Sequence, residues 1–313
     1  MSRFSRFRVE QLNDYSLNER KSKVRIEDLA RTPSENSLTA FLESLPNILA
    51  GKDLRELVAA IKRAKRLGKP IIWGFGGHVV KVGLGPVLAS LMENGYVTPL
   101  ATNGSGIIHD FEMALSGHTS EDVDQQLGTG AFGMVRETGQ WINDAILEGA
   151  EKDLGLGESV GERLIAESPP YAEYSLLCQS LKHGIPLTVH VAFGTDIIHN
   201  HPAASGQATG ACAQVDFQIF THQVSCLNGG GVYLNVGSAV ILPEVFLKAV
   251  SLVRNSGQEL ENFTTANLDF IQHYRPLQNV VRRPVLNSGR GLALTGHHEI
   301  MIPLLAALLV HGA

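Results

Sequence analysis

The sequence has few cysteines, no surplus of basic charge and no long hydrophobic run, and each absence excludes a class of protein. Its cysteines, Cys178, Cys212 and Cys226, are odd in number and lack CxxC spacing, so they fit a reducing compartment better than a disulfide framework. The longest apolar stretch, 300–310, is interrupted by Pro303 and is too short to span a bilayer. The N-terminus carries several arginines and lysines but no apolar core. We therefore expect no signal peptide and a cytoplasmic protein.

The charge balance argues against polyanionic partners. The 26 Lys and Arg residues are outnumbered by 31 Asp and Glu residues, which gives a formal net charge of -5. The densest basic run, 62–66, is interpreted as a solvated helix face. Without a positive field, we expect neither a nucleic acid nor a membrane as partner, and we expect a small-molecule substrate.

The chain of 313 residues is long enough for one large α/β unit. Residues 1–37 are polar and charged. They are interpreted as an arm that packs on the body or on a neighbouring subunit, with disorder as the alternative. Residues 38–313 are predicted to form a single domain of NAD-binding type, without internal repeats.

Apolar spacing predicts alternating helices and strands from Asp53 onward. This alternation is typical of βαβ units, so we predict an α/β fold with a doubly wound, mostly parallel sheet of Rossmann-like type. In such sheets, ligands bind beyond the carboxyl ends of the strands. The predicted helices are 53–68, 84–95, 177–184 and 243–257, and the predicted strands are 70–74, 97–102, 186–193, 231–236 and 263–266.

Glycine-rich turns follow the first two predicted strands, at 74–78 and 102–106. Glycine lets backbone N–H groups approach a phosphate, and a following helix N-terminus adds partial positive charge. The first turn is not a clean GxGxxG because Val79 occupies the third position, so a tight turn with positive φ is the alternative. Two such turns on successive strands favour nucleotide binding.

Half of the 12 histidines fall at the predicted strand ends or in the turns after them. Histidine suits acid–base work near neutral pH and also ligates metals. The HxH and HHE patterns are compatible with a metal site, but their spacing is generic, and we expect hydrogen-bonding histidines in a polar cleft and no metal. These residues are His78, His109, His199, His201, His297 and His298.

From about Asp53 to its C-terminus, the chain resembles deoxyhypusine synthase, an NAD-dependent enzyme with a Rossmann-like fold. The most specific stretch is 82–111, where the run 101–106 and Asp110 fall at the family's Thr-Ala-Gly-Gly-Val-Glu-Glu-Asp segment. A second match is the helix ending at Gly184 and the strand that leads to Asp196. Further matches are Gly237-Ser238, Phe263-Thr264-Thr265-Ala266, Arg275-Pro276 and Pro303-Leu304-Leu305.

The resemblance implies an NAD site and a homotetramer of paired dimers with active sites between subunits. It also implies that residues 1–37 reach a neighbouring site. Asp196 would lie where the family holds its amine substrate, with Asp110 also on the substrate side. The residues implied at NAD are Gly77, His78, Val79, Val80, Lys81, Thr102, Asn103, Gly104, Thr264, Thr265, His297 and His298.

The chain departs from the family on the substrate side. The family places a lysine shortly after the Arg-Pro pair, where it forms an imine with the butylamine fragment. Here the run 277–285 contains Arg282 and Arg283, and no lysine follows Lys248. Arginine stays protonated and cannot act as that nucleophile. The family's second acidic residue before Asp110 is His109 here.

We therefore expect an NAD-dependent enzyme of transferase or oxidoreductase type that acts on a small amine or amino-acid-like substrate, and not a true deoxyhypusine synthase. His109 is the first candidate for acid–base catalysis, ahead of His199 and His201. Asp196 or Glu299 would orient a histidine or bind an amine. Arg282 and Arg283 would clamp a carboxylate, with a surface pair as the alternative.

Two other functions stay open at this stage. One is a metal-dependent hydrolase or lyase that uses His199, His201, His297 and His298. The other is a non-catalytic protein that binds or senses NAD.

Overall fold

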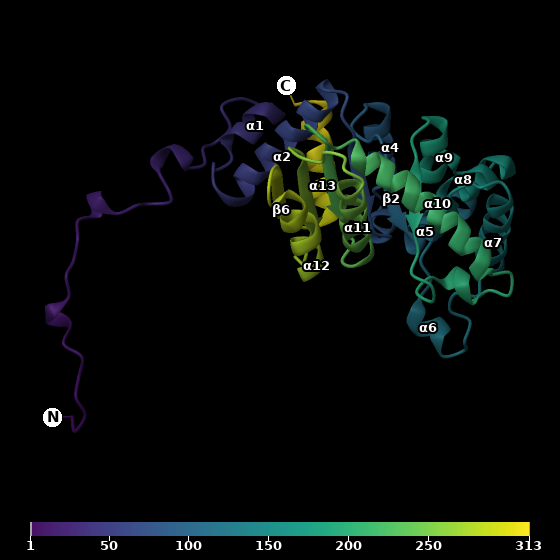
Figure 1. Ribbon diagram of the computed structural model, residues 1–313, viewed down its shortest axis with the longest axis horizontal. Helices are drawn as coiled ribbons and strands as arrows, with labels where there is room; N and C mark the ends of the chain where they lie inside the picture. Colours follow the sequence, from purple (N-terminus) through teal and green to yellow (C-terminus); the bar gives the residue numbers. More distant parts are fainter. Residues whose placement is uncertain (1, 313) are drawn as a thin grey trace.

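The computed structural model describes residues 2–312, which contain a single sheet of six parallel strands flanked by helices (Figure 1). The strand order is β3-β2-β1-β4-β5-β6. The predicted α/β, doubly wound, Rossmann-like fold is confirmed. The strands are β1 Ile71–Phe75, β2 Leu100–Asn103, β3 Leu187–His190, β4 Val232–Val236, β5 Thr264–Asp269 and β6 Arg290–Thr295.

The central strands form because both of their faces are apolar and buried. Every residue of β1 and β4 is buried, as expected for parallel strands covered by helices on each side. Along β1, Ile71 and Trp73 belong to one core layer, whereas Ile72 faces the other layer with Phe220 and Phe246.

Helices cover both sides of the sheet. One core layer includes side chains from α2, α4, α5, α8 and α13, and the other is formed largely by α10 and α11. The bounds are α1 Leu38–Ser44, α2 Leu49–Arg66, α3 His78–Lys81, α4 Gly85–Glu93, α5 Gly104–Ser116, α6 Val123–Leu127, α7 Arg136–Glu151, α8 Leu156–Glu167, α9 Leu176–Lys182, α10 Gly206–Ser225, α11 Ile241–Asn255, α12 Tyr274–Pro276 and α13 His298–Val310. Within residues 2–312, no helix is both long and apolar enough to cross a membrane.

The five predicted strands correspond to β1–β5, with ends displaced by a few residues. The sixth strand, β6, was not predicted. It is an outer strand with only Leu292 and Leu294 buried, and Gly291 and Arg290 at its start weaken the apolar signal.

Residues 2–24 run away from the body, as the purple segment of Figure 1 shows, whereas Asp28 and Arg31 form backbone hydrogen bonds with Asn47 and Ser44. Short 3₁₀ turns interrupt the segment 2–37, and the Ser37 hydroxyl caps α1 by accepting from Ala40 N–H at 3.1 Å. Apolar side chains on it, including Phe4 and Phe7, are exposed. The predicted packing of this arm on a neighbouring subunit stays a prediction.

Candidate functional site at the carboxyl ends of the strands

The sheet has its topological switch point between β1 and β4, because β1 leads to β2 on one side while β4 begins the other half. The turns that follow these two strands touch each other. A Cβ added at Gly76 would overlap with the carbonyl oxygen of Gly237, and Gly237 itself has φ +64°. Only glycine permits both features, so the floor of the crevice is backbone.

The two glycine-rich turns predicted from the sequence are neighbours. A Cβ at Gly77 would overlap with the Ser105 hydroxyl, which places the turn after β1 against the start of α5. Asn103 caps α5 by accepting from Gly106 N–H at 3.1 Å. Val79 and Val80 are buried in the core, so their side chains are not offered to a ligand.

Three of the predicted cofactor residues, far apart in sequence, meet on one side of the crevice. His78 lies 5.5 Å from His298 between ring centroids, and Phe270 stacks on His297 at 6.4 Å. His298 is fully buried: its Nε2 lies 3.1 Å from the carbonyl oxygen of Leu268, whereas its Nδ1 has no partner among residues 2–312. Burial, followed by the influence of His298, lowers the pKa of His78.

The other side of α3 borders a cavity of about 220 Å³, which we call the inner cavity. Lys81, Ser105, His109, Glu112 and Asp196 are among the residues that line it. It brings the first acid–base candidate and the predicted amine-binding carboxylate into one space, beside the only lysine in its lining.

Asp196 is the most perturbed acid of the inner cavity. Its carboxylate lies against Gly104 at the start of α5, where a Cβ would overlap with it, and only 6% of the residue is exposed. Burial raises the pKa of Asp196 to about 6, and a hydrogen bond from the Ser105 backbone partly opposes this shift. Its Oδ2 is buried without a partner among the described residues.

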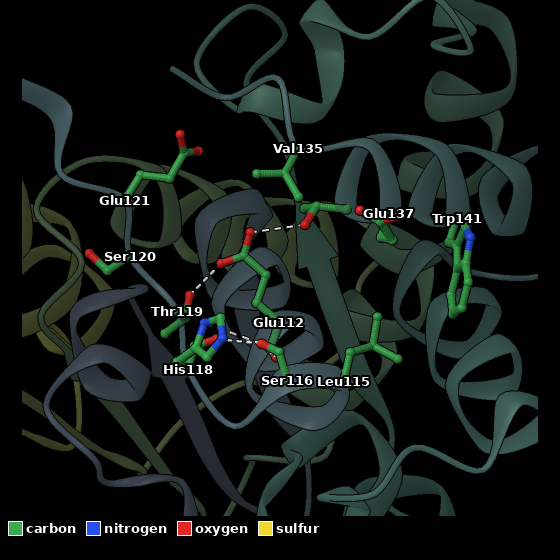
Figure 2. Close-up of a pocket in the computed structure, with 11 residues that line it drawn as sticks. Glu112, Leu115, Ser116, His118, Thr119, Ser120, Glu121, Val135, Glu137 and Trp141 are labelled. Carbon is green, nitrogen blue, oxygen red and sulfur yellow. Dashed lines mark hydrogen bonds between the residues drawn. The ribbon is translucent and has the colours of Figure 1, made fainter. Parts of the chain in front are cut away.

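A chain of hydrogen bonds orients His109. Thr119 donates its hydroxyl proton to Glu112, so the 2.8 Å contact between Thr119 Oγ1 and His109 Nδ1 requires the proton on Nδ1. The second Glu112 oxygen accepts from the Thr138 hydroxyl at 3.0 Å. Figure 2 shows the bond between Glu112 and Thr119. His109 Nε2 is thereby left as the proton acceptor. Burial lowers the pKa of His109, which favours this neutral form.

The structure corrects the expectation for Asp110. It is buried and accepts from the Ser175 hydroxyl at 2.6 Å and from the backbone N–H groups of Leu176 and Leu177 at 2.7 and 3.0 Å. These bonds hold the start of α9, so Asp110 is a helix-capping residue and does not line the inner cavity.

The other histidine candidates have local partners. His199 Nδ1 accepts from Gly194 N–H at 3.2 Å, its ring stacks on Phe193 at 4.4 Å, and burial lowers its pKa. His201 Nδ1 accepts from Ala203 N–H at 3.2 Å. Both follow β3 outside the lining of the inner cavity.

Glu299 and the arginine pair also lie apart from His109. Glu299 is exposed and lies 3.7 Å from His297. Arg282 bonds to the side chain of Gln278 at 3.2 Å, and Arg283 bonds to that of Asn279 at 2.7 Å. Both arginines lie outside the inner cavity and are exposed, which agrees with the surface-pair alternative.

Two predicted cofactor residues lie at the wrong end of their strand for the crevice. Thr264 begins β5, and the Thr265 hydroxyl donates to the Val280 carbonyl at 2.7 Å. The crevice lies at the opposite end of β5, near Asp269. Thr102, by contrast, is at the correct end, although its hydroxyl donates to Phe75 at 2.9 Å.

The four-histidine metal cluster does not form. Its two pairs follow β3 and β6, the two outer strands of the sheet. Among residues 2–312, no group of three or more His, Cys, Asp or Glu side chains is arranged to hold a metal. Within this chain, the four histidines therefore do not form the shared ligand set on which the hydrolase or lyase alternative depends.

Sequence reasoning missed Glu112, Thr119, Thr138 and Trp141. Glu112 could have been predicted from the sequence, because it lies three residues after His109 and therefore on the same face of the helix. The two threonines reach Glu112 from later segments, and no local signal in the sequence reveals those contacts.

Comparisons with known proteins support the fold. No protein-family model and no curated protein matches the sequence. A conserved LOR/SDH protein from Methanococcus maripaludis S2 matches with a TM-score of 0.52 and 16% identity, over 90% of this chain and 72% of that one. AgrE in its complex with ornithine and NAD⁺ matches with a TM-score of 0.53 and 14% identity, over 82% of this chain.

The match covers 32% of the AgrE chain, so this protein spans about a third of the length of AgrE. A protein from Entamoeba histolytica described as a deoxyhypusine synthase matches over 84% of this chain and 89% of its own, with 12% identity. Its TM-score of 0.46 is too low to support an argument. These likenesses establish an α/β fold that the chain shares with the first two proteins, and the resemblance to deoxyhypusine synthase stays a prediction.

Proposed function

We propose that this protein is an NAD-dependent enzyme that moves hydride between the nicotinamide and a small amine or amino-acid-like substrate. The observation that carries the proposal is the inner cavity, where His109, oriented through Thr119 and Glu112, lies with the buried Asp196 beside the switch-point crevice. The complex of the structurally similar AgrE with ornithine and NAD⁺ is consistent with this substrate class.

The crevice fits a dinucleotide on two observations. Gly76, Gly77 and Gly237 carry no side chains of their own, so their peptide groups form the floor, with the Ser105 hydroxyl and the His298 ring packed beside it. Asn235 Oδ1 and His298 Nδ1 are buried there without partners among residues 2–312. We assign NAD to these residues, with His78 and His297 at its edge. When bound, NAD⁺ supplies a hydride acceptor.

The chain's own residues would bind the amine and remove its proton. Above a pH of about 6, the Asp196 carboxylate is charged and pairs with the substrate ammonium group. His109 Nε2 takes one proton from the nitrogen as the carbon–hydrogen bond gives its electron pair to the acceptor, which leaves an iminium product. Lys81 is placed to pair with a carboxylate, if the substrate carries one.

Transfer through a lysine imine is not part of the proposal. No lysine follows Lys248, and Arg282 and Arg283 stand in the segment where the resemblance would require it. The proposed chemistry therefore ends at oxidation or reduction of the substrate carbon.

Calorimetric titration of NAD⁺ into the purified protein tests the cofactor assignment. We expect one site per chain, lost in Gly104→Asp, whose new carboxylate would collide with Asp196, and retained in Gly210→Asp, where a Cβ meets no atom within 4 Å. Absence of binding in folded, cofactor-free protein would refute the proposal.

Turnover tests the reaction separately. We expect amine-dependent formation of NADH that His109→Ala abolishes. If NAD⁺ binds but no amine, amino acid or hydroxy acid reduces it, the non-catalytic NAD-binding alternative holds instead.

A further inference from the structure

A second cavity adjoins the inner cavity and is not explained by acid–base chemistry. We call it the chamber; its volume is about 560 Å³, within the range of small-molecule sites. Glu112, Ser120 and Glu121 line both cavities, so the two are neighbours with a shared wall. Figure 2 shows the chamber bounded by Trp141, Leu115 and Val135.

The side chains that line the chamber favour binding of an apolar group of a ligand. Leu115, Val135 and Trp141 present aliphatic and indole surface, and the Trp141 ring is fixed by an edge contact with Phe111 at 6.4 Å. Burial of apolar area on such walls contributes to binding affinity. A chain or ring of a substrate would gain affinity there that a short, fully polar molecule would not.

The charges of the chamber select for a cation. Glu112, Glu121 and Glu137 line it, and no lysine or arginine does. Glu112 accepts from two threonines and Glu121 from Gly133 N–H, all neutral donors. Among residues 2–312, none of the three carboxylates forms an ion pair with lysine or arginine. Although Arg163 lies over the Trp141 ring at 5.8 Å, the residues that line the chamber carry a net negative charge, which disfavours an anionic group there.

We propose that the chamber and the inner cavity form one elongated site for a primary amine that carries an apolar chain or ring, with its ammonium group at the buried Asp196 and its apolar body in the chamber. The inference rests on the proposed function for the fate of the amine and narrows its substrate class. A carboxylate at the far end of the molecule is disfavoured, because it would enter the chamber, which is bounded by carboxylates, whereas a carboxylate next to the amine would lie in the inner cavity with Lys81.

Binding can be measured without NAD by tryptophan fluorescence. Of the two tryptophans, Trp73 is buried within β1 and Trp141 lines the chamber, so a change in emission reports on the chamber. The probes are phenethylamine, 3-phenylpropanoate as an anion of similar size, and putrescine as a cation without an apolar end. We expect phenethylamine to bind at least about tenfold more tightly than either of the others.

Two matched variants locate the site. Val135→Arg places a cation and bulk in the chamber, whereas Leu147→Arg alters an equally exposed position of α7 outside it; the wild-type residues are 37% and 40% exposed. We expect Val135→Arg to weaken phenethylamine about tenfold or more and Leu147→Arg to leave it unchanged. Equal binding by both variants, or preference for phenylpropanoate or putrescine, would overturn the inference.

The binding experiment tests the chamber separately from the NAD site. Phenethylamine binding that responds to Val135→Arg in a protein that fails to bind NAD⁺ would support the chamber and refute the proposed function. NAD⁺ binding and turnover of amines that Val135→Arg leaves unchanged would support the proposed function and refute the chamber.

Discussion

At the scale of single residues, the chemistry depends on where a few protons lie. Thr119 has one hydroxyl proton and gives it to Glu112, which obliges His109 to donate from Nδ1 and leaves Nε2 free to accept. His109 itself could be predicted from the sequence, because histidine follows a strand end there. Its partners could not, because Thr119 and Thr138 reach Glu112 from segments outside α5.

Replacing Thr119 tests this dependence. Thr119→Val removes the acceptor for His109 Nδ1, so we expect turnover of an amine to fall about tenfold or more, because proton transfer from a positioned base contributes at least that much. Thr119→Ser keeps the hydroxyl and should retain most of the activity. Nitrogen NMR of His109 should show the Nδ1–H tautomer in the wild type and in the serine variant. The same tautomer in the valine variant would contradict the assignment.

Asp196 should set the acid limb of the pH profile. Its folded pKa of about 6 lies above its ordinary value, so the carboxylate that pairs with an ammonium group forms only as the pH rises through about 6. We expect kcat/KM for an amine to rise between pH 5 and 7 and then to level off. In Asp196→Asn we expect a lower plateau of kcat/KM and no rise near pH 6. A rise near pH 6 that persists in this variant would show that another group titrates there.

At the scale of helices and strands, local patterns were informative and distant contacts were not. The apolar spacing predicted α2, α4, α9, α11 and the first five strands, because these elements bury one stripe or one run each. The spacing could not reveal β6, whose small and half-exposed residues carry little pattern. It also could not reveal that Asp110 holds the start of α9, since the partner Ser175 lies 65 residues away.

At the start of α5, helix propensity and packing are expected to have opposite effects on stability when glycine is replaced by alanine. Gly210→Ala lies within α10 with open space around it, so we expect it to stabilise the protein by about 0.5–1 kcal/mol. Gly104→Ala offers the same gain in propensity, but its Cβ would overlap with the Asp196 carboxylate, so we expect a net destabilisation of about 1–3 kcal/mol. Chemical denaturation of both variants measures the difference. Equal stabilisation by both would show that Asp196 does not rest on Gly104.

At the scale of the whole molecule, the body buries its apolar side chains and the N-terminal arm does not. The body buries two apolar layers, whereas Phe4, Phe7, Val9 and Leu12 on the arm are exposed to solvent. Apolar side chains that are left open in this way are typical of a surface that a partner covers. We propose a homo-oligomer, and its tetrameric form stays a prediction.

Light scattering measures the assembly directly. We expect the full chain to have a mass that is a multiple of 33.8 kDa, and a variant that lacks residues 2–24 to shift towards smaller species. The cut leaves the Arg25–Asp28 contact and the cap of α1 in place, so the body should unfold at nearly the same denaturant concentration when compared at high dilution. A full-length protein with a mass of 33.8 kDa would contradict the oligomer.

The contact between the turns at Gly76 and Gly237 has a consequence for how the specificity of this fold can change. Where the two halves of the sheet meet, peptide groups touch without any side chain between them. Where a side chain lines a site, substitutions can change its size and polarity in small steps. At these glycines, any substitution adds a Cβ that would disrupt the contact between the two turns. Any new substrate preference must therefore arise from the surrounding helices and loops, such as the residues around Trp141, while the floor beneath them stays the same.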